Sequence, residues 1–201
     1  FGTHEVLLGN FVTDVTGTDV AGIRWFELRR NPGDTMWSLF QEGTHMLPDG
    51  DSRWMAAIAM DDAGNIALAY SVSGPSTFPG LRYTGRLASD PLGQMTQGEN
   101  LIIDGESSQT GSVRWGDYAA LSVDPSDGST FWFTSEYGTG GAWSTQVATF
   151  SFAGAAPAPG PTLPPGSALA DLGDTIMGDR GVDTIIGATG DDFIVGSFDA
   201  D

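Results

Sequence analysis

The chain has 201 residues, enough for one modest domain and an appendage. Its 26 acidic residues outnumber the 8 basic ones, all arginines, and the net charge of −18 disfavours nucleic acid and anionic lipid and favours divalent cations. It contains neither a run of about 18 apolar residues nor a basic stretch followed by an apolar one, so we expect no membrane span and no signal peptide within it. Because it begins at Phe1, we expect a piece of a longer protein.

The residues up to about 154 are expected to form short strands joined by turns. The chain holds 29 glycines and 11 prolines together with many Thr, Val, Phe and Trp residues, a composition typical of β proteins. Strand patterns cover 22–29, 36–41, 81–87 and 100–104, and strand–turn–strand patterns cover 53–71 and 114–134. The predicted fold class is all-β, with antiparallel sheets.

The two hairpin patterns form an internal repeat. Arg53-Trp54 and, 61 residues later, Arg114-Trp115 each precede a small apolar strand, a turn with Asp and Gly, and a second apolar strand. Asp caps such a turn and Gly adopts the positive φ that the turn requires. Four strands repeated about every 60 residues predict the blades of a β-propeller, and about four blades are needed for closure. We therefore expect residues 1–154 to be an N-terminally truncated, propeller-like domain, with a different stack of β-sheets as the alternative.

One of these turns carries a family resemblance. The segment Ser122-Val-Asp124-Pro-Ser-Asp-Gly128-Ser-Thr130-Phe-Trp132 resembles a degenerate Asp-box hairpin of the sialidase-like propellers, with extra residues in the turn and before the Trp. The earlier copy, at 59–64, lacks the Ser and the Thr-Trp of that motif. The resemblance implies a structural hairpin at the periphery of a blade, away from any active centre.

A proline-rich segment divides the chain. Five of the twelve residues at 155–166 are proline, which favours an extended, polyproline-like linker. Almost all aromatic residues precede this segment, whereas Gly and Asp dominate the residues that follow it. We expect a β domain at 1–154, a linker at 155–166 and a separate unit at 167–201.

The last unit repeats every nine residues. Position 6 of each nonapeptide is Asp, position 8 is Ile in the three that reach it, and Gly is frequent at positions 1 and 4. The array resembles the calcium-binding nonapeptides of secreted bacterial RTX (haemolysin-type) proteins, although the second Gly of their Gly-Gly-x-Gly-x-Asp pattern is absent throughout. A disordered acidic tail is the alternative.

This spacing has a physical basis. Six residues form a turn and three form a short strand, so residues i and i+18 of a parallel β-roll lie about 4.8 Å apart. Columns of carboxylates at that separation need a cation between them, and calcium binds six to eight oxygens. The expected calcium site consists of Asp174, Asp183, Asp192 and Asp201 with the turns that contain Gly178, Gly181, Gly187 and Gly190. We expect this unit to fold only when calcium is bound.

The β domain also contains candidate catalytic residues. Sialidase-like propellers use an arginine cluster, a Tyr–Glu nucleophile pair and an Asp acid, so the resemblance points to Arg53, Arg114, Asp117, Glu136 and Tyr137. Recurrence of the Arg-Trp pairs at the blade period favours instead a structural role, with guanidinium groups stacked on indole or bridging blades. Aromatic residues that could stack on sugars are Trp25, Phe26, Trp37, Trp54, Trp115, Trp132 and Trp143, but in strands such residues are more often core.

Together these features predict a secreted, extracellular, calcium-binding protein, which the RTX resemblance implies is exported by a type I system. Its propeller-like module would bind a carbohydrate or a surface protein, and no nucleic-acid partner is expected. The alternatives are an extracellular glycoside hydrolase of sialidase type and a structural surface or biofilm protein. Because the chain has no cysteine, calcium would take the stabilising role that disulfides have in other secreted proteins.

Overall fold

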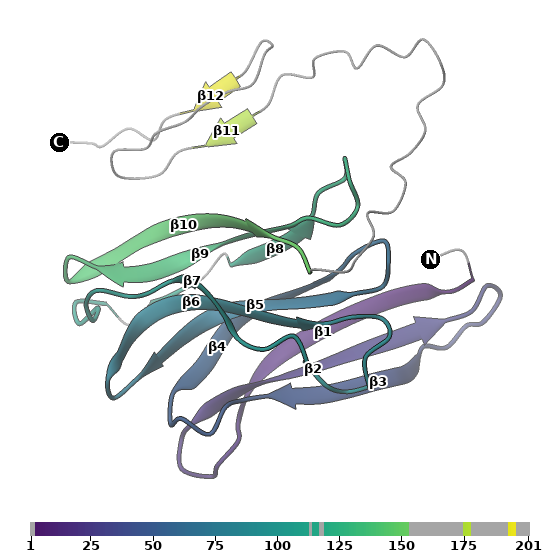
Figure 1. Cartoon of the computed structure of the whole chain (residues 1–201), viewed down its shortest axis with the longest axis horizontal. Coiled ribbons are helices and arrows are strands. Elements are labelled where there is room, and N and C mark those ends of the chain that lie inside the picture. The colour runs from purple at the N-terminus through teal and green to yellow at the C-terminus, as the bar shows by residue number, and fades with distance from the viewer. Residues whose placement is uncertain (1–2, 113, 117–118, 153–174, 178–192, 196–201) are drawn as a thin grey trace. The chain divides into compact units, whose positions relative to one another are not determined.

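The computed structural model describes residues 3–112, 114–116, 119–152, 175–177 and 193–195. These residues form β-strands and connections without a helix, which confirms the all-β prediction (Figure 1). Accordingly, this part of the chain contains no helix that could cross a membrane. The chain divides into two units, Phe1–Gly160 and Pro161–Asp201, at a boundary that falls inside the proline-rich segment 155–166.

The strands described in the first unit form three antiparallel sheets, each a meander in chain order. The first sheet contains β1 (Glu5–Asp14), β2 (Ala21–Arg30) and β3 (Ser38–His45). The second contains β4 (Ser52–Met60), β5 (Ile66–Gly74), β6 (Thr77–Arg86) and β7 (Asn100–Ile103). The third contains β8 (Ala120–Val123), β9 (Phe131–Thr139) and β10 (Ala142–Phe150). Every predicted strand overlaps one of these, whereas β1 and β10 have no counterpart among the predicted segments.

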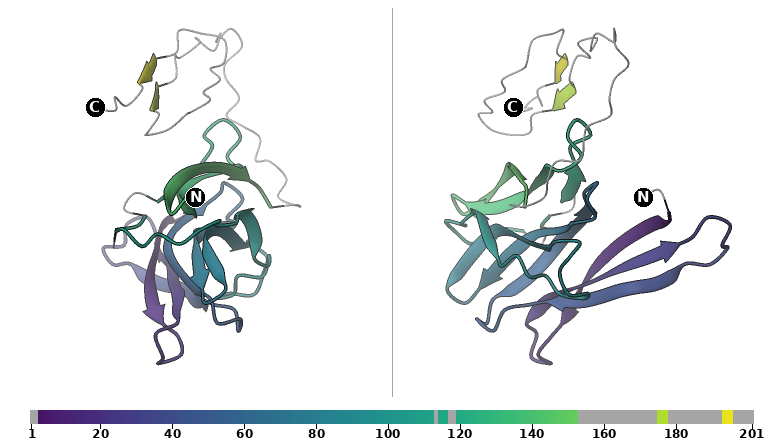
Figure 2. Two further views of the ribbon diagram at one scale, coloured as in Figure 1. Left: turned by 90° about the vertical axis from the view of Figure 1, so that its left-hand side faces the viewer. Right: turned by 45° about the vertical axis from the view of Figure 1, so that its right-hand side comes forward.

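The four-stranded sheet lies between the two three-stranded sheets (Figure 1). Successive residues of a strand point to opposite faces, so Leu68 and Tyr70 of β5 pack with Ile23 of β2, whereas Ala69 packs with Phe133 of β9. Figure 2 shows the same layering from two further sides. Burial on both faces explains the nearly continuous apolar sequence of β5.

Small residues of the central sheet face large residues of the third sheet. Ala67 of β5 packs with Phe131 and Phe152. At Gly85 of β6 an added Cβ would come within 2.1 Å of the Phe152 ring. The close approach of these two sheets therefore requires alanine and glycine at these positions.

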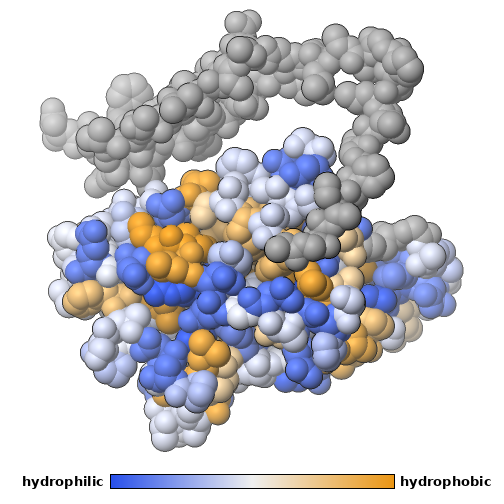
Figure 3. All heavy atoms as spheres, viewed as in Figure 1, coloured by the Kyte–Doolittle hydropathy of each residue, from blue (hydrophilic) through white to orange (hydrophobic). Residues whose placement is uncertain are grey.

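Large apolar side chains are also exposed on the first and third sheets. Phe11 and Leu39 are 53% and 55% exposed, and Trp132 and Trp143 are 44% and 41% exposed. In the view of Figure 3, small hydrophobic patches alternate with hydrophilic surface over the described residues. The core thus lies between the sheets, and Trp132 and Trp143 do not belong to it.

The Asp–Gly turns form as predicted. In the β4–β5 turn, the Asp61 carboxylate accepts hydrogen bonds from the backbone N–H groups of two following residues, and Gly64 has a φ of +85°. In the β8–β9 turn, the Asp127 carboxylate accepts two backbone N–H groups and one hydroxyl, and Gly128 has a φ of +64°. The N–H of Asp62 donates to the Gly128 carbonyl at 2.8 Å. The two turns therefore meet, and β4 and β8 end on the same side of the stack.

In the second unit, the described residues form two short parallel strands, β11 (Thr175–Met177) and β12 (Phe193–Val195). Each paired residue lies 18 positions from its partner, for example Ile176 opposite Ile194. Both strands occupy positions 7 to 9 of a nonapeptide. The pairing agrees with the spacing that the repeat predicts for a parallel β-roll.

Candidate functional site

A hollow of about 650 Å³ opens at one end of the first unit. It is lined by the β1–β2 turn, the start of β4, the β5–β6 turn and the β7–β8 connection. Asp19 and Arg114 are the charged residues among the described part of the lining, and its polar members otherwise are Ser52, Ser73, Thr77, Ser108, Gln109 and Ser112. Its volume lies within the range of small-molecule pockets, which combine apolar and aromatic surface with a few polar groups.

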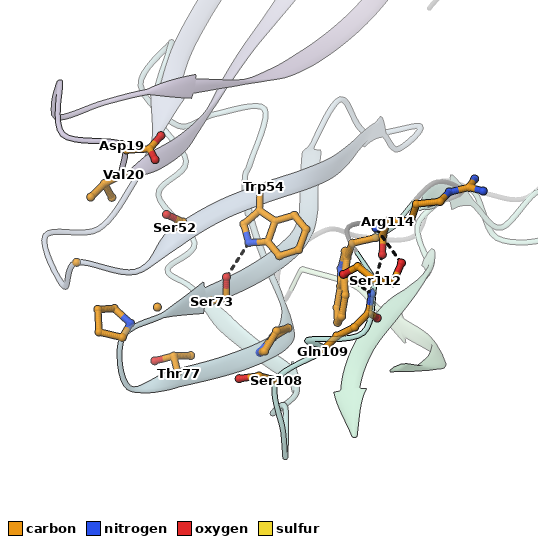
Figure 4. Close-up of a pocket in the computed structure, with 15 residues that line it drawn as sticks. Asp19, Val20, Ser52, Trp54, Ser73, Thr77, Ser108, Gln109, Ser112 and Arg114 are labelled. Carbon is orange, nitrogen blue, oxygen red and sulfur yellow. Dashed lines mark hydrogen bonds between the residues drawn. The ribbon is translucent and has the colours of Figure 1, made fainter. Parts of the chain in front are cut away.

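Two indole rings supply apolar surface to this hollow, called here the tryptophan hollow. Trp54, at the start of β4, donates its Nε1–H to Ser73 Oγ at 3.1 Å, and Trp115 donates its Nε1–H to Ser71 Oγ at 3.2 Å. The ring centroids lie 5.5 Å apart, with the rings tilted by 52°. Figure 4 shows the Trp54 ring projecting from its strand into the space between Ser73 and Ser112. Because both indole N–H groups are engaged, the rings are held in fixed orientations.

The backbone beside Trp54 is irregular. The pairing of β4 with β5 shifts register between Trp54 and Ala57, which marks a β-bulge. Met55, inside the bulge, has a φ of +47°, a left-handed conformation that costs a residue with a Cβ about 1–2 kcal/mol. Bulges and strained residues concentrate at functional sites, where they redirect a neighbouring side chain. The bulge therefore begins directly after Trp54, at the edge of the hollow.

The β7–β8 connection is held beside the hollow by hydrogen bonds between side chains and backbone. Gln109 Nε2 donates to the Arg114 carbonyl at 2.8 Å, and the Arg114 N–H donates to Ser112 Oγ at 3.1 Å. The N–H of Gly116, a residue with a φ of +62°, donates to the Glu136 carboxylate at 3.1 Å. Figure 4 shows the Arg114 side chain extending away from Trp54. The surface left facing the hollow is therefore mainly neutral.

Arg53, for which the sequence allows a catalytic or a structural role, is fully buried. Two of its hydrogen bonds reach Asp49 at 2.7 and 3.0 Å, two reach Glu99 at 2.7 and 3.1 Å, and one reaches the Asp51 carbonyl at 2.9 Å. These bonds use all five N–H groups of the guanidinium. Arg53 therefore has no donor left for a substrate, and its contacts support the structural interpretation.

Arg53, Asp49, Glu99, Tyr70 and His45 form one polar cluster, called here the Arg53 cluster. The Tyr70 hydroxyl donates to Glu99 at 2.8 Å, and His45 Nε2 lies 2.7 Å from the Tyr70 oxygen. Burial alone would raise the pKa of Glu99, but the neighbouring His45 and the hydrogen bonds from Arg53 and Tyr70 hold that pKa well below its usual range. Burial and the Glu99 carboxylate raise the pKa of Tyr70, so its hydroxyl stays protonated. This Tyr–Glu pair is a buried structural element.

The other predicted catalytic residues lie in different surroundings. Arg114 lines the tryptophan hollow, and Glu136 accepts the Gly116 hydrogen bond beside it. Tyr137 packs in the core with Phe133, and Asp117 lies outside the described residues. The structure therefore brings Arg114 and Glu136 to the β7–β8 connection, but it does not bring Arg53 or Tyr137 to the hollow.

The expectation that the strand tryptophans are core holds for some of them. Trp25 is fully buried, and Trp115 is 9% exposed but also lines the hollow together with Trp54. The serines of the lining were not singled out by the sequence, because no motif or spacing distinguishes them. The sequence also does not identify the acidic partners of Arg53. A buried arginine requires such partners, but only the structure shows that Arg53 is buried.

The predicted calcium residues, Asp174, Asp183, Asp192, Asp201, Gly178, Gly181, Gly187 and Gly190, lie outside the described residues. Within the described part of the chain, no group of three or more His, Cys, Asp or Glu side chains is placed to hold a metal ion. Comparison of the chain with protein-family models, with curated proteins and with solved structures finds no match.

Proposed function

We propose that the first unit is a carbohydrate-binding module and that the tryptophan hollow is its ligand site. The supporting observation is the pair of indole rings, Trp54 and Trp115, fixed beside neutral hydroxyl and amide groups. Sugar rings have apolar C–H faces that stack on aromatic rings and hydroxyls that bond with Ser, Thr and Gln. The mainly neutral lining favours an uncharged sugar, and the net charge of −18 disfavours acidic polysaccharides.

Affinity electrophoresis of the whole chain tests this proposal with four polysaccharide probes, laminarin, mannan, xylan and the acidic polymer alginate. We expect at least one neutral polymer to retard the protein, and alginate to have no effect. Trp54→Ala should weaken the retardation roughly tenfold, since it removes an aromatic stacking surface. Trp143→Ala is the matched control, because that ring is exposed on β10 and does not line the hollow.

Two results would contradict the carbohydrate proposal. Equal losses in the Trp54 and Trp143 variants would assign any binding to exposed aromatic surface in general. Retardation by alginate alone would contradict the choice of a neutral ligand. Binding is proposed in preference to sialidase-type hydrolysis because Arg53 is saturated by Asp49 and Glu99 and Tyr137 packs in the core.

We also propose that residues 167–201 bind calcium and that the protein acts outside the cell. The supporting observation is the 18-residue offset between β11 and β12, the period of two nonapeptides. In a parallel β-roll of that period, Asp174 would stack on Asp192 and Asp183 on Asp201, about one strand separation apart. Calcium would neutralise these carboxylates, and extracellular modules bind it at about 0.1–1 mM.

Isothermal titration of calcium into the whole chain tests this second proposal. We expect calcium binding to saturate below about 10 mM, a concentration that exceeds the usual dissociation constants of extracellular sites. Replacing Asp183 and Asp192 together by Ala should abolish it, whereas Asp104→Ala, which removes an exposed acid of the first unit, should leave it unchanged. A titration that the double variant does not alter would reject the nonapeptide site.

A further inference from the structure

A second hollow, of about 290 Å³, lies at the opposite end of β4 and β5 from the tryptophan hollow. It is lined by the end of β2, the β4–β5 turn, the end of β6 and the β6–β7 connection. Its titratable lining residues are His4, Arg29 and Arg86, and no carboxylate of the described residues lines it. The described lining of this hollow is therefore basic, whereas the chain as a whole is acidic, with 26 acidic and 8 basic residues.

Arg86 is buried with few hydrogen-bond acceptors. The residue is 2% exposed, and its side chain donates one hydrogen bond, from Nη2 to the Asp90 carbonyl at 2.7 Å. The buried Nε–H has no acceptor among the described residues. Arg53, by comparison, is fully buried and has acceptors for all five N–H groups. A buried guanidinium with so few acceptors favours a nearby anion.

The two carboxylates near Arg86 are hydrogen-bonded to other groups. Glu27 is fully buried and accepts hydrogen bonds from Arg29 Nε and Gln41 Nε2, each at 2.5 Å. The Asp90 carboxylate, for its part, accepts hydrogen bonds from the Leu87 N–H and from a threonine and a glutamine of the β6–β7 connection. Burial is the main cause that lowers the pKa of Arg86, although Glu27 and Asp90 oppose it. No carboxylate of the described residues is therefore hydrogen-bonded to the Arg86 guanidinium.

We infer that this second hollow binds the carboxylate of a small organic acid. Arg86 and Arg29 face the carboxylate, whose two oxygens match the planar guanidinium fork. Met60 and Leu92 line the same hollow and provide apolar surface for the rest of the ligand, beside Phe40, whose ring stacks with the Arg29 guanidinium at 3.3 Å. A phosphate carries about two negative charges near neutral pH and has no apolar part to use this surface. The inference does not depend on the carbohydrate proposal, since the two hollows share no lining residue.

Titration of benzoate into the whole chain, followed by NMR chemical shifts, tests the inference. A ligand of this size with ordinary efficiency has a Kd of the order of 1 mM. We expect saturable binding in that range, and at least tenfold weaker binding of benzamide, which has the same shape without the charge. Inorganic phosphate should compete no better than benzoate; stronger competition by phosphate would overturn the choice of a carboxylate.

Substitutions locate the binding. Leu92→Glu introduces a negative charge at a position that is 55% exposed, so it leaves the buried groups intact and should weaken benzoate binding at least tenfold. Arg86→Met should weaken it similarly, whereas Arg82→Met, on the same strand but outside the hollow, should not. Trp54→Ala should also have no effect. Equal binding of benzoate and benzamide, or unchanged binding in the Leu92→Glu variant, would overturn the inference even if the Arg86 variant does not fold.

Discussion

Replacing Arg53 by Met measures what the Arg53 cluster contributes to folding. The substitution leaves Glu99, whose side chain is 15% exposed, without its two guanidinium hydrogen bonds, whereas Asp49, 42% exposed, can be rehydrated. Removal of one partner from a buried ion pair costs about 3–5 kcal/mol, whereas loss of an exposed pair costs about 0–1 kcal/mol. We therefore expect a loss of about 3–5 kcal/mol, mostly from Glu99, against a total of about 5–15 kcal/mol for a typical domain.

Urea unfolding followed by tryptophan fluorescence provides the assay. All six tryptophans lie between residues 25 and 143, so the whole chain can be used and the signal reports the first unit. Arg24→Met is the matched control, because its partner Glu42 is 46% exposed, and it should lose no more than about 1 kcal/mol. Adding Glu99→Gln to Arg53→Met should recover part of the loss, since an unpaired buried amide costs less than an unpaired carboxylate. An Arg53 variant as stable as the Arg24 variant would refute the reasoning.

Three further substitutions test the turns, the bulge and the sheet packing. Hydrogen bonds from a hydroxyl and from backbone N–H groups lower the pKa of Asp127 to about 2. The contribution of Asp127 to stability is therefore complete above its unfolded pKa of about 3.9 and is lost as the pH falls towards 2. Asp127→Asn should flatten that part of an acid-unfolding curve. Met55→Gly relieves the φ of +47° and should raise stability by up to about 1 kcal/mol while weakening sugar retardation; unchanged retardation would separate the bulge from binding. Gly85→Ala places a Cβ 2.1 Å from the Phe152 ring and should cost about 1–3 kcal/mol in urea unfolding, whereas Gly111→Ala, with no atom within 4 Å, should cost far less.

The strands and turns of the first unit could be predicted because their signals are local. Asp61 and Gly64 lie within one turn, and the apolar run of β5 extends over consecutive residues. The nine-residue period likewise predicts the offset between β11 and β12. The sites could not be predicted in the same way. Arg53 binds Glu99 across 46 residues, and Ser73 reaches the same hollow as Ser112 only because separate connections meet at one end of the stack.

The Arg-Trp repeat shows how a pattern with a structural cause can also assemble a site. Because β4 and β8 end on the same side of the stack, the start of β4 and the segment before β8 also meet, and the ring centroids of Trp54 and Trp115 lie 5.5 Å apart although 61 residues separate them. The two arginines have different surroundings, because Arg53 is buried among its acidic partners, whereas Arg114 lines the hollow. The first copy therefore fixes the strand through its arginine, and both copies contribute an indole to the hollow.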